Sequence, residues 1–155
     1  VTDTGTLFLP GGSGFGLSID FGNKLLVGFD YYSRNWSEFK SFDIHDSLGD
    51  YTKVVLGAQF TPDPKSTSSY FKTAQYRIGY HQENTYLMLS GQQLNKSGMS
   101  FGLGLPLKRI QSTLNLAFEF GTRGTTDNSL LKENYWIAGF GITLIDIWFL
   151  KRKYN

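Results

Sequence analysis

The sequence predicts an all-β fold, an antiparallel transmembrane β-barrel of the Gram-negative outer-membrane type. Two observations lead to this prediction. Runs in which every second residue is apolar recur along the chain, and short turns alternate with long polar loops. Alternation with a period of two is the pattern of a strand whose two faces meet different surroundings. Short turns at one rim and long loops at the other are typical of outer-membrane barrels.

The composition agrees with this fold class. Of the 155 residues, 16% are aromatic and 18% are charged, and the chain has 18 glycines and no cysteine. The charged fraction lies below the roughly 25% of soluble domains, yet the mean hydropathy of -0.25 is not that of a helical membrane protein. A membrane barrel explains both values, because only alternate strand residues meet lipid. The net charge of +2 is too small for a nucleic-acid-binding face.

A tight hairpin is expected first. Gly22-Asn23 is turn chemistry, and it separates two alternating runs at residues 14–22 and 25–32. The apolar faces of the two runs are formed by Phe15, Leu17, Ile19 and Phe21, and by Leu25, Val27, Phe29 and Tyr31. No helix would separate apolar from small and polar residues in this way.

Further alternating runs follow at residues 53–60, 76–81, 98–107, 113–120 and 136–145. The total is therefore about seven strands. Two segments leave the count open. Residues 86–89 extend a strand or form a separate one, and Pro62 to Thr73 is long where a short turn is due. A transmembrane helix over Tyr135 to Leu150 is excluded by its length, by Asp146 and by glycines at alternate positions.

The connections are expected to alternate in length. Short turns are predicted at Gly22-Asn23 and Lys108-Arg109, and long polar loops at Trp36 to Asp50, Glu83 to Lys96 and Gly121 to Glu133. Aromatic residues gather near the strand ends, where amphipathic rings would lie at the two boundaries between lipid and water. The expected location is the bacterial outer membrane, with membrane lipid in contact with the apolar face.

The less apolar face is rich in glycine and carries scattered polar residues. We take Asp30, Arg77, Asn115 and Glu119 as candidate lumen-facing residues, on alternation alone. Glycines allow close approach of neighbouring strands, and the charges would pair inside the lumen. The functional alternative is that these residues line a path for a solute.

The sequence predicts no enzyme, no catalytic residue, no metal site and no cofactor. The two histidines, His45 and His81, do not have the spacing of metal ligands. His81 and Glu83 with a nearby serine could be drawn as a hydrolytic site, but no glycine-framed serine accompanies them. The glycine runs are not phosphate loops, since no helix pattern follows them.

Several short motifs occur in a characteristic order. They are Leu9-Pro10-Gly11 before a Gly-x-Gly strand, Phe29-Asp30-Tyr31 leading to Trp36-Ser37, Leu56 to Asp63, Tyr76 to Tyr80, Gly102 to Pro106, and Lys132 to Tyr135 followed by Asp146 to Lys153. In this order they resemble the C-terminal half of the outer-membrane long-chain fatty-acid transporter (FadL-type) family. The resemblance spans nearly the whole chain.

The resemblance implies a fourteen-stranded barrel with an N-terminal plug that carries hydrophobic small molecules through a side opening. Residues 1–155 would then be a single segment, the C-terminal part of the barrel, which explains the odd strand count and the absence of a signal peptide. Family members also serve as accessory barrels in larger assemblies.

Two alternatives remain open. The chain could be a non-enzymatic structural or accessory subunit of an outer-membrane secretion or assembly complex, with other outer-membrane proteins as partners. It could also be a small self-contained barrel of eight strands, either in the membrane or as a soluble ligand binder.

Overall fold

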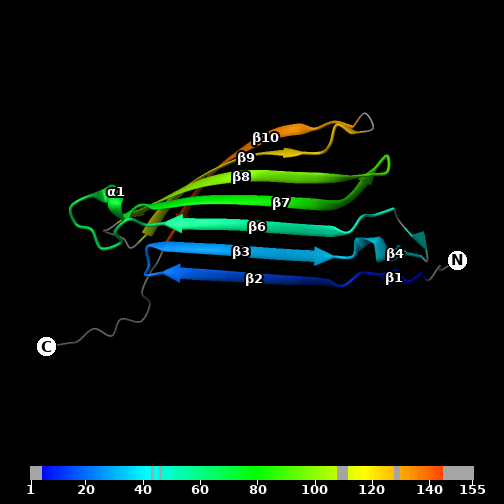
Figure 1. Cartoon of the computed structure of the whole chain (residues 1–155), viewed down its shortest axis with the longest axis horizontal. Helices are drawn as coiled ribbons and strands as arrows, with labels where there is room; N and C mark the ends of the chain where they lie inside the picture. Colours follow the sequence, from blue (N-terminus) through cyan, green and yellow to red (C-terminus); the bar gives the residue numbers. More distant parts are fainter. Residues whose placement is uncertain (1–4, 43, 46, 108–111, 128–129, 145–155) are drawn as a thin grey trace.

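The computed structural model describes residues 5–42, 44, 45, 47–107, 112–127 and 130–144. Its main body is one seven-stranded antiparallel sheet in the order β10-β9-β8-β7-β6-β3-β2 (Figure 1). The strands are β2 (Gly12–Phe21), β3 (Leu25–Arg34), β6 (Tyr51–Phe60), β7 (Gln75–Leu89), β8 (Gln92–Leu107), β9 (Ser112–Arg123) and β10 (Glu133–Thr143). The seven expected strands are confirmed within the described residues.

Shorter elements lie between the main strands. A small sheet in the order β1-β4-β5 consists of β1 (Leu7–Phe8), β4 (Lys40–Ser41) and β5 (Ile44–His45). A 3-10 turn, η1 (Trp36–Glu38), precedes β4, and one helical turn, α1 (Tyr70–Thr73), precedes β7. In the described ranges no helix is long and apolar enough to cross a membrane. None of these short elements was expected from the sequence.

The first hairpin has the expected turn. Gly22 and Asn23 both have positive φ angles, +62° and +60°, as the two central residues of a type I′ turn do. Three residues, Gly22 to Lys24, connect the strands, and the backbone N–H of Lys24 donates to the carbonyl oxygen of Phe21 at 3.3 Å. The backbone N–H of Asn23 also donates to Oδ1 of Asp20 at 2.8 Å. Glycine and asparagine are the residues that adopt this conformation most readily, so the dipeptide sets where β2 ends. The predicted turn at Lys108-Arg109 lies outside the described residues.

The polar segment from Glu83 to Lys96 is not a loop, contrary to expectation. β7 continues to Leu89 and β8 begins at Gln92, so that residues 86–89 extend a strand. The two strands are joined at Ser90 and Gly91, which both have positive φ angles. The register shifts between Asn84 and Met88, and this bulge interrupted the alternation on which the sequence reading depended.

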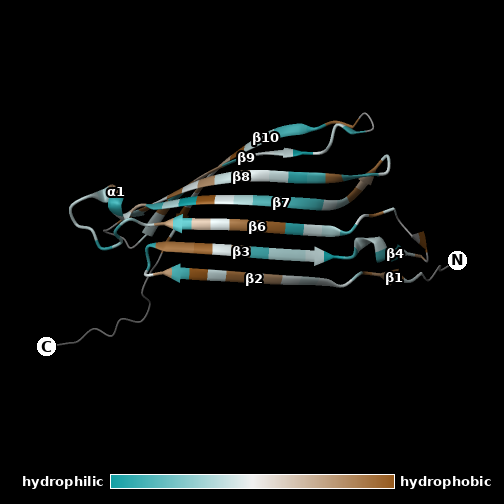
Figure 2. Cartoon of the chain, in the orientation of Figure 1, coloured by the Kyte–Doolittle hydropathy of each residue, from teal (hydrophilic) through white to brown (hydrophobic). Residues whose placement is uncertain are grey.

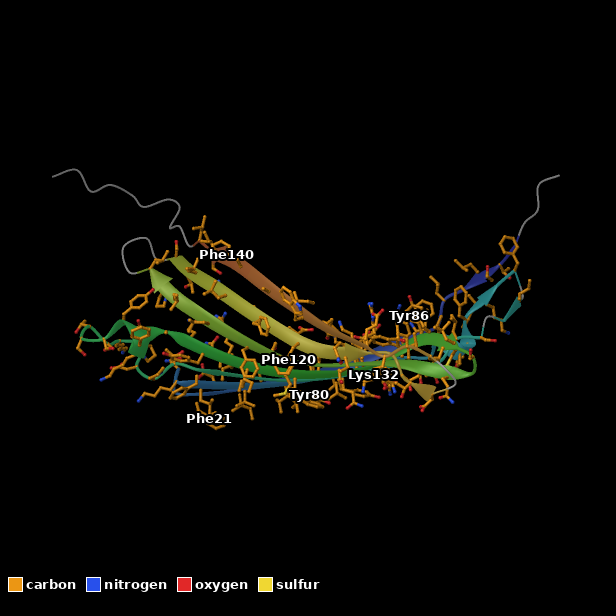
Figure 3. All side chains as sticks on the ribbon, turned by 90° about the horizontal axis from the view of Figure 1, so that it is seen from above. Phe21, Tyr80, Tyr86, Phe120, Lys132 and Phe140 are labelled. Carbon is orange, nitrogen blue, oxygen red and sulfur yellow. The ribbon has the colours of Figure 1, made fainter. Side chains whose placement is uncertain are left out.

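The register brings the apolar residues of neighbouring strands together on one side, which we call the outer face. Its central rows are Leu17, Phe29, Leu56, Tyr80, Met99, Phe120 and Trp136, then Ile19, Val27, Ala58, Ile78, Phe101, Phe118 and Ala138, then Phe21, Leu25, Phe60, Tyr76, Leu103, Leu116 and Phe140. Figure 2 shows the alternation of hydrophobic and hydrophilic residues along the strands. In Figure 3 the sheet is curved, and Phe21 and Tyr80 point to the same side.

No other part of the described chain covers the outer face. Among the described residues Ala74 is the one buried hydrophobic residue, whereas Trp136 and Phe140 are 72% and 70% exposed. Such a continuous apolar surface marks contact with a membrane or with another protein.

The sheet is open in the described part of the chain. β2 pairs with β3 alone and β10 pairs with β9 alone, so the two edge strands lie at opposite margins of the sheet (Figure 1). The expected all-β, antiparallel architecture is therefore observed, but a closed barrel is not.

Candidate functional site on the inner face

The opposite side of the sheet, which we call the inner face, is made mostly of small and polar residues. One of its rows runs across all seven strands as Ser18, Gly28, Gly57, Gly79, Ser100, Glu119 and Ile137. The scarcity of bulky side chains leaves room for long polar ones to lie flat across neighbouring strands. Two hydrogen-bonded clusters use this room.

The first cluster is centred on Arg77 of β7. Its Nε donates to Oε1 of Gln59 at 2.8 Å and its Nη1 donates to Oδ1 of Asn115 at 2.9 Å. Nη2 donates to Oε1 of Gln75. Asn115 in turn donates from Nδ2 to Oγ1 of Thr143 on β10 at 3.0 Å. The network therefore connects β6, β7, β9 and β10.

Two glycines of β8 make the Arg77 cluster possible. A Cβ added at Gly102 would lie 3.1 Å from Cβ of Arg77, and one at Gly104 would lie 2.8 Å from Oε1 of Gln75. Both distances are shorter than ordinary carbon contacts, which are about 3.5–4.0 Å. Glycine thus allows Arg77 to cross β8 and reach Asn115.

The second cluster joins His81 of β7, Glu119 of β9 and Tyr135 of β10. The hydroxyl of Tyr135 donates to Oε1 of Glu119 at 2.8 Å and lies 3.4 Å from Nε2 of His81. Nε2 of His81 is 3.9 Å from Oε1 of Glu119. A Cβ at Gly98 or Gly121 would lie 2.8 or 2.6 Å from the Tyr135 hydroxyl. This cluster therefore uses the same arrangement, in which a long side chain crosses glycines of a neighbouring strand.

We call the end of the sheet where β3 ends and β6 begins the long-loop end. A row of charged residues crosses the inner face between the two clusters and this end. The row is Lys53, Glu83, Lys96, Arg123 and Glu133, one residue per strand from β6 to β10. Arg123 Nη2 lies 2.8 Å from Oε2 of Glu133, and Lys53 Nζ lies 4.0 Å from Oε2 of Glu83. The Lys96 ammonium lies 5.2 Å from the ring centroid of Tyr135.

The loop from Asn35 to Asp50 is held at the long-loop end by local contacts. Oδ1 of Asp50 accepts two hydrogen bonds from Ser37, one from the hydroxyl at 2.6 Å and one from the backbone N–H of Ser37 at 3.1 Å. These bonds hold the pKa of Asp50 below its usual value of 3.8. The Trp36 ring centroid lies 5.1 Å from that of Tyr86 on the β7–β8 hairpin. Gln93 donates from Nε2 to the carbonyl oxygen of Asp50 at 2.7 Å.

The register places the four sequence-predicted candidates on the inner face. Arg77 and Asn115 are brought together in one cluster, and Glu119 belongs to the other. Asp30 is exposed and has no hydrogen-bond or ion-pair partner in the described part of the chain. Whether the four residues line a path for a solute stays a prediction.

Other members of the two clusters were not predicted from the sequence. Gln59 and Gln75 lie at alternate positions on the face of Arg77, so parity within β6 and β7 could have indicated them. Tyr135 was grouped with the aromatics of the strand ends, whereas its hydroxyl contacts Glu119 on the inner face. That contact depends on the pairing of β9 with β10, which a single strand's pattern does not reveal.

The two clusters provide hydrogen-bond partners for polar side chains of the inner face and connect neighbouring strands. In the described residues no group of three or more His, Asp or Glu side chains could hold a metal ion. His81 and Glu83, the residues of the hydrolytic alternative, lie on the same face of β7. Nε2 of His81 lies 3.9 Å from Oε1 of Glu119, and Oε2 of Glu83 lies 4.0 Å from Nζ of Lys53.

The comparisons with known proteins identify the family. The family model described as BamG matches residues 1–155. Searches of the curated proteins and of the solved structures gave no match. The expected resemblance to FadL-type transporters is therefore wrong, because BamG is a different family. The motifs behind it, alternating glycines, apolar residues and turn residues, recur wherever strands have one apolar and one small-residue face. The chain belongs to the BamG family, a family of components of the BAM complex of the bacterial outer membrane.

Proposed function

We propose that this chain forms part of the wall of an outer-membrane β-barrel that acts as a non-enzymatic accessory subunit of the BAM complex. The proposal combines the family match over residues 1–155 with the uncovered apolar outer face. It replaces transport of fatty acids, for which the BamG family gives no support.

Membrane contact is favoured by the composition of the outer face. Its three central rows contain aromatic and aliphatic residues with no charged side chain, across all seven strands. The next row towards the long-loop end is partly polar, with Gln82, Ser97, Thr122 and Asn134 on β7 to β10. An apolar band that ends at a polar border is the surface of a barrel that meets lipid.

A structural role is favoured by the inner face. Arg77 donates hydrogen bonds to neutral side chains on β6, β7 and β9. The hydroxyl of Tyr135 on β10 donates to Glu119 on β9. These side chains hold one another across the strands. A wall stiffened in this way would present a fixed surface to the other subunits of a complex.

The proposal is tested by isolating the full-length protein, carrying an affinity tag, from outer membranes dissolved in mild detergent. We expect the BAM subunits to be recovered in near-equal molar amounts, as quantified by mass spectrometry. An unrelated, equally abundant outer-membrane barrel with the same tag is the control. Recovery of BAM subunits no greater than with the control barrel would reject the assignment to the complex.

A further inference from the structure

The two edge strands of the sheet run in the same direction. Six antiparallel pairings connect β2 to β10, so the chain direction reverses six times between them. If β2 and β10 paired directly, the seam between them would be parallel. Bacterial outer-membrane barrels are antiparallel throughout and have an even number of strands.

Neither edge is protected against pairing. Exposed edge strands are usually blunted by charges, prolines or bulges. The central parts of the edge strands, residues 13–19 of β2 and 134–142 of β10, contain no charged residue and no proline. Their register with β3 and β9 is continuous, without a bulge. These edges therefore have the features of strands that pair on both sides.

The exposure of residues on the edge strands also indicates that a neighbour is missing at each edge. On the outer face Phe15 of β2 and Trp136 of β10 are 60% and 72% exposed, whereas Phe101 and Phe118 in the middle of the sheet are 44% and 45% exposed. In lipid, the unpaired N–H and C=O groups of an open edge are strongly unfavourable, because no water is present to bond them. The proposed outer-membrane location, on which this inference rests, therefore requires a neighbour at each edge.

A second copy of the chain does not provide these neighbours. A copy inserted in the same orientation would place its β2 beside β10 as a parallel pair, because the two edges share one direction. An inverted copy would pair antiparallel, but its loops would then face the wrong side of the membrane.

We propose that both edges are closed by further strands of the same polypeptide, odd in number, whose first and last strands run antiparallel to β2 and β10. The path of the chain supports a common polypeptide. Residues 5–11 reach β2 at the long-loop end, where β1 pairs with β4. A preceding strand that runs towards that end is antiparallel to β2. Strands of one polypeptide also avoid the loss of translational and rotational freedom that separate chains pay when they associate.

The first test uses disulfide trapping in the full-length protein in its native membrane. Leu17 and Phe29 are cross-strand partners, so the variant with Leu17→Cys and Phe29→Cys is the positive control and should form a disulfide. The variant with Leu17→Cys and Trp136→Cys should form none. A disulfide in that variant, within one chain or between two chains, would show direct closure or closure by a second copy and would overturn the proposal.

The second test identifies the source of the closing strands. Backbone amide exchange is measured on the full-length protein in detergent after removal of all other BAM subunits. We expect amides of residues 13–19 and 134–142 to exchange as slowly as those of residues 98–105 in β8, an interior strand. Exchange as fast as that of the loop around Ser37 would overturn closure by the same polypeptide. This outcome does not depend on co-isolation with BAM subunits, so the two proposals fail separately.

Discussion

Arg77 on β7 donates a hydrogen bond from Nη1 to Oδ1 of Asn115 on β9, 2.9 Å away, across the intervening strand β8. Hydrogen bonds of the backbone connect each strand to its direct neighbours alone. A side-chain bond that passes over a strand adds a connection between strands that are second neighbours.

This bond should be measurable as a coupling free energy. Arg77→Met, Asn115→Ala and the double variant form a double-mutant cycle, evaluated by urea unfolding of the protein in lipid vesicles. We expect a coupling of about 1 kcal/mol, since hydrogen bonds to charged groups contribute about 1.5–3 kcal/mol and this site is partly exposed. Arg77→Met with Glu119→Gln, which belongs to the other cluster, is the control and should be additive. Additive effects in the first cycle would contradict the bond.

The glycine under Tyr135 should be sensitive to a single methyl group. In Gly121→Ala the added Cβ would lie 2.3 Å from the backbone oxygen of Ser97 and 2.6 Å from the Tyr135 hydroxyl. Because the first contact is with backbone, we expect a loss of about 1–3 kcal/mol, the usual cost of overpacking. Thermal unfolding in detergent measures it.

Gly141→Ala is the matched control for that variant. Gly141 also lies on the inner face, on β10, and a Cβ there would have no heavy atom within 4 Å. We expect its unfolding temperature to stay within error of the parent protein. Equal shifts for both variants would contradict the close approach of β8, β9 and the Tyr135 side chain at Gly121.

The loop from Asn35 to Asp50 should loosen in acid. The hydrogen bonds from Ser37 lower the pKa of Asp50 in the folded state. The stabilisation is therefore fully present above the ordinary pKa of 3.8 and is lost as the pH falls through the lower folded-state pKa. Amide exchange of Ser37, corrected for the intrinsic rate at each pH, should show protection at pH 6 that disappears at acidic pH. In Asp50→Asn we expect weaker protection that does not change with pH, and an unchanged acid response would contradict this role.

The outer face should reject a charge that the inner face accepts. Phe101 and Ser100 are adjacent on β8 and lie on opposite faces. Phe101→Arg should destabilise the membrane-inserted protein by about 2–4 kcal/mol, the cost of an arginine near the bilayer midplane. Ser100→Arg lies opposite Glu119 and should cost much less. Similar losses of inserted protein for the two variants, measured in isolated outer membranes, would argue against a lipid-facing outer face.

Much of the sheet could be predicted from alternation, because the sequence of each strand by itself shows which of its residues share a face. Residues 98–107 and 113–120 alternate without interruption, and the structure has β8 and β9 there. The pattern failed where the backbone departs from a regular strand. At the bulge between Asn84 and Met88 the β7 strand has extra residues relative to β8, so alternation breaks although pairing continues.

The clusters could be predicted only in part, for a related reason. Alternation indicated that Arg77 and Asn115 share a face, but their contact also requires the order β7-β8-β9, the register and two glycines on β8. Family membership was still harder to infer. A transporter and an assembly subunit can share the same lipid-facing pattern. The pattern arises from contact with lipid, which barrels of different function have in common.

The β7–β8 hairpin has a topographic consequence. Beyond Asn84 and Asn95 the strands β7 and β8 pair in the sheet only with each other. At about 3.3 Å per residue, the five residues from Thr85 to Leu89 span about 16 Å. The hairpin is also braced at its side, where Trp36 packs against Tyr86. In an outer-membrane barrel of the usual orientation, long connections face the exterior. The tip at Ser90 and Gly91 would then be among the parts of this chain that antibodies or phages encounter on a living cell.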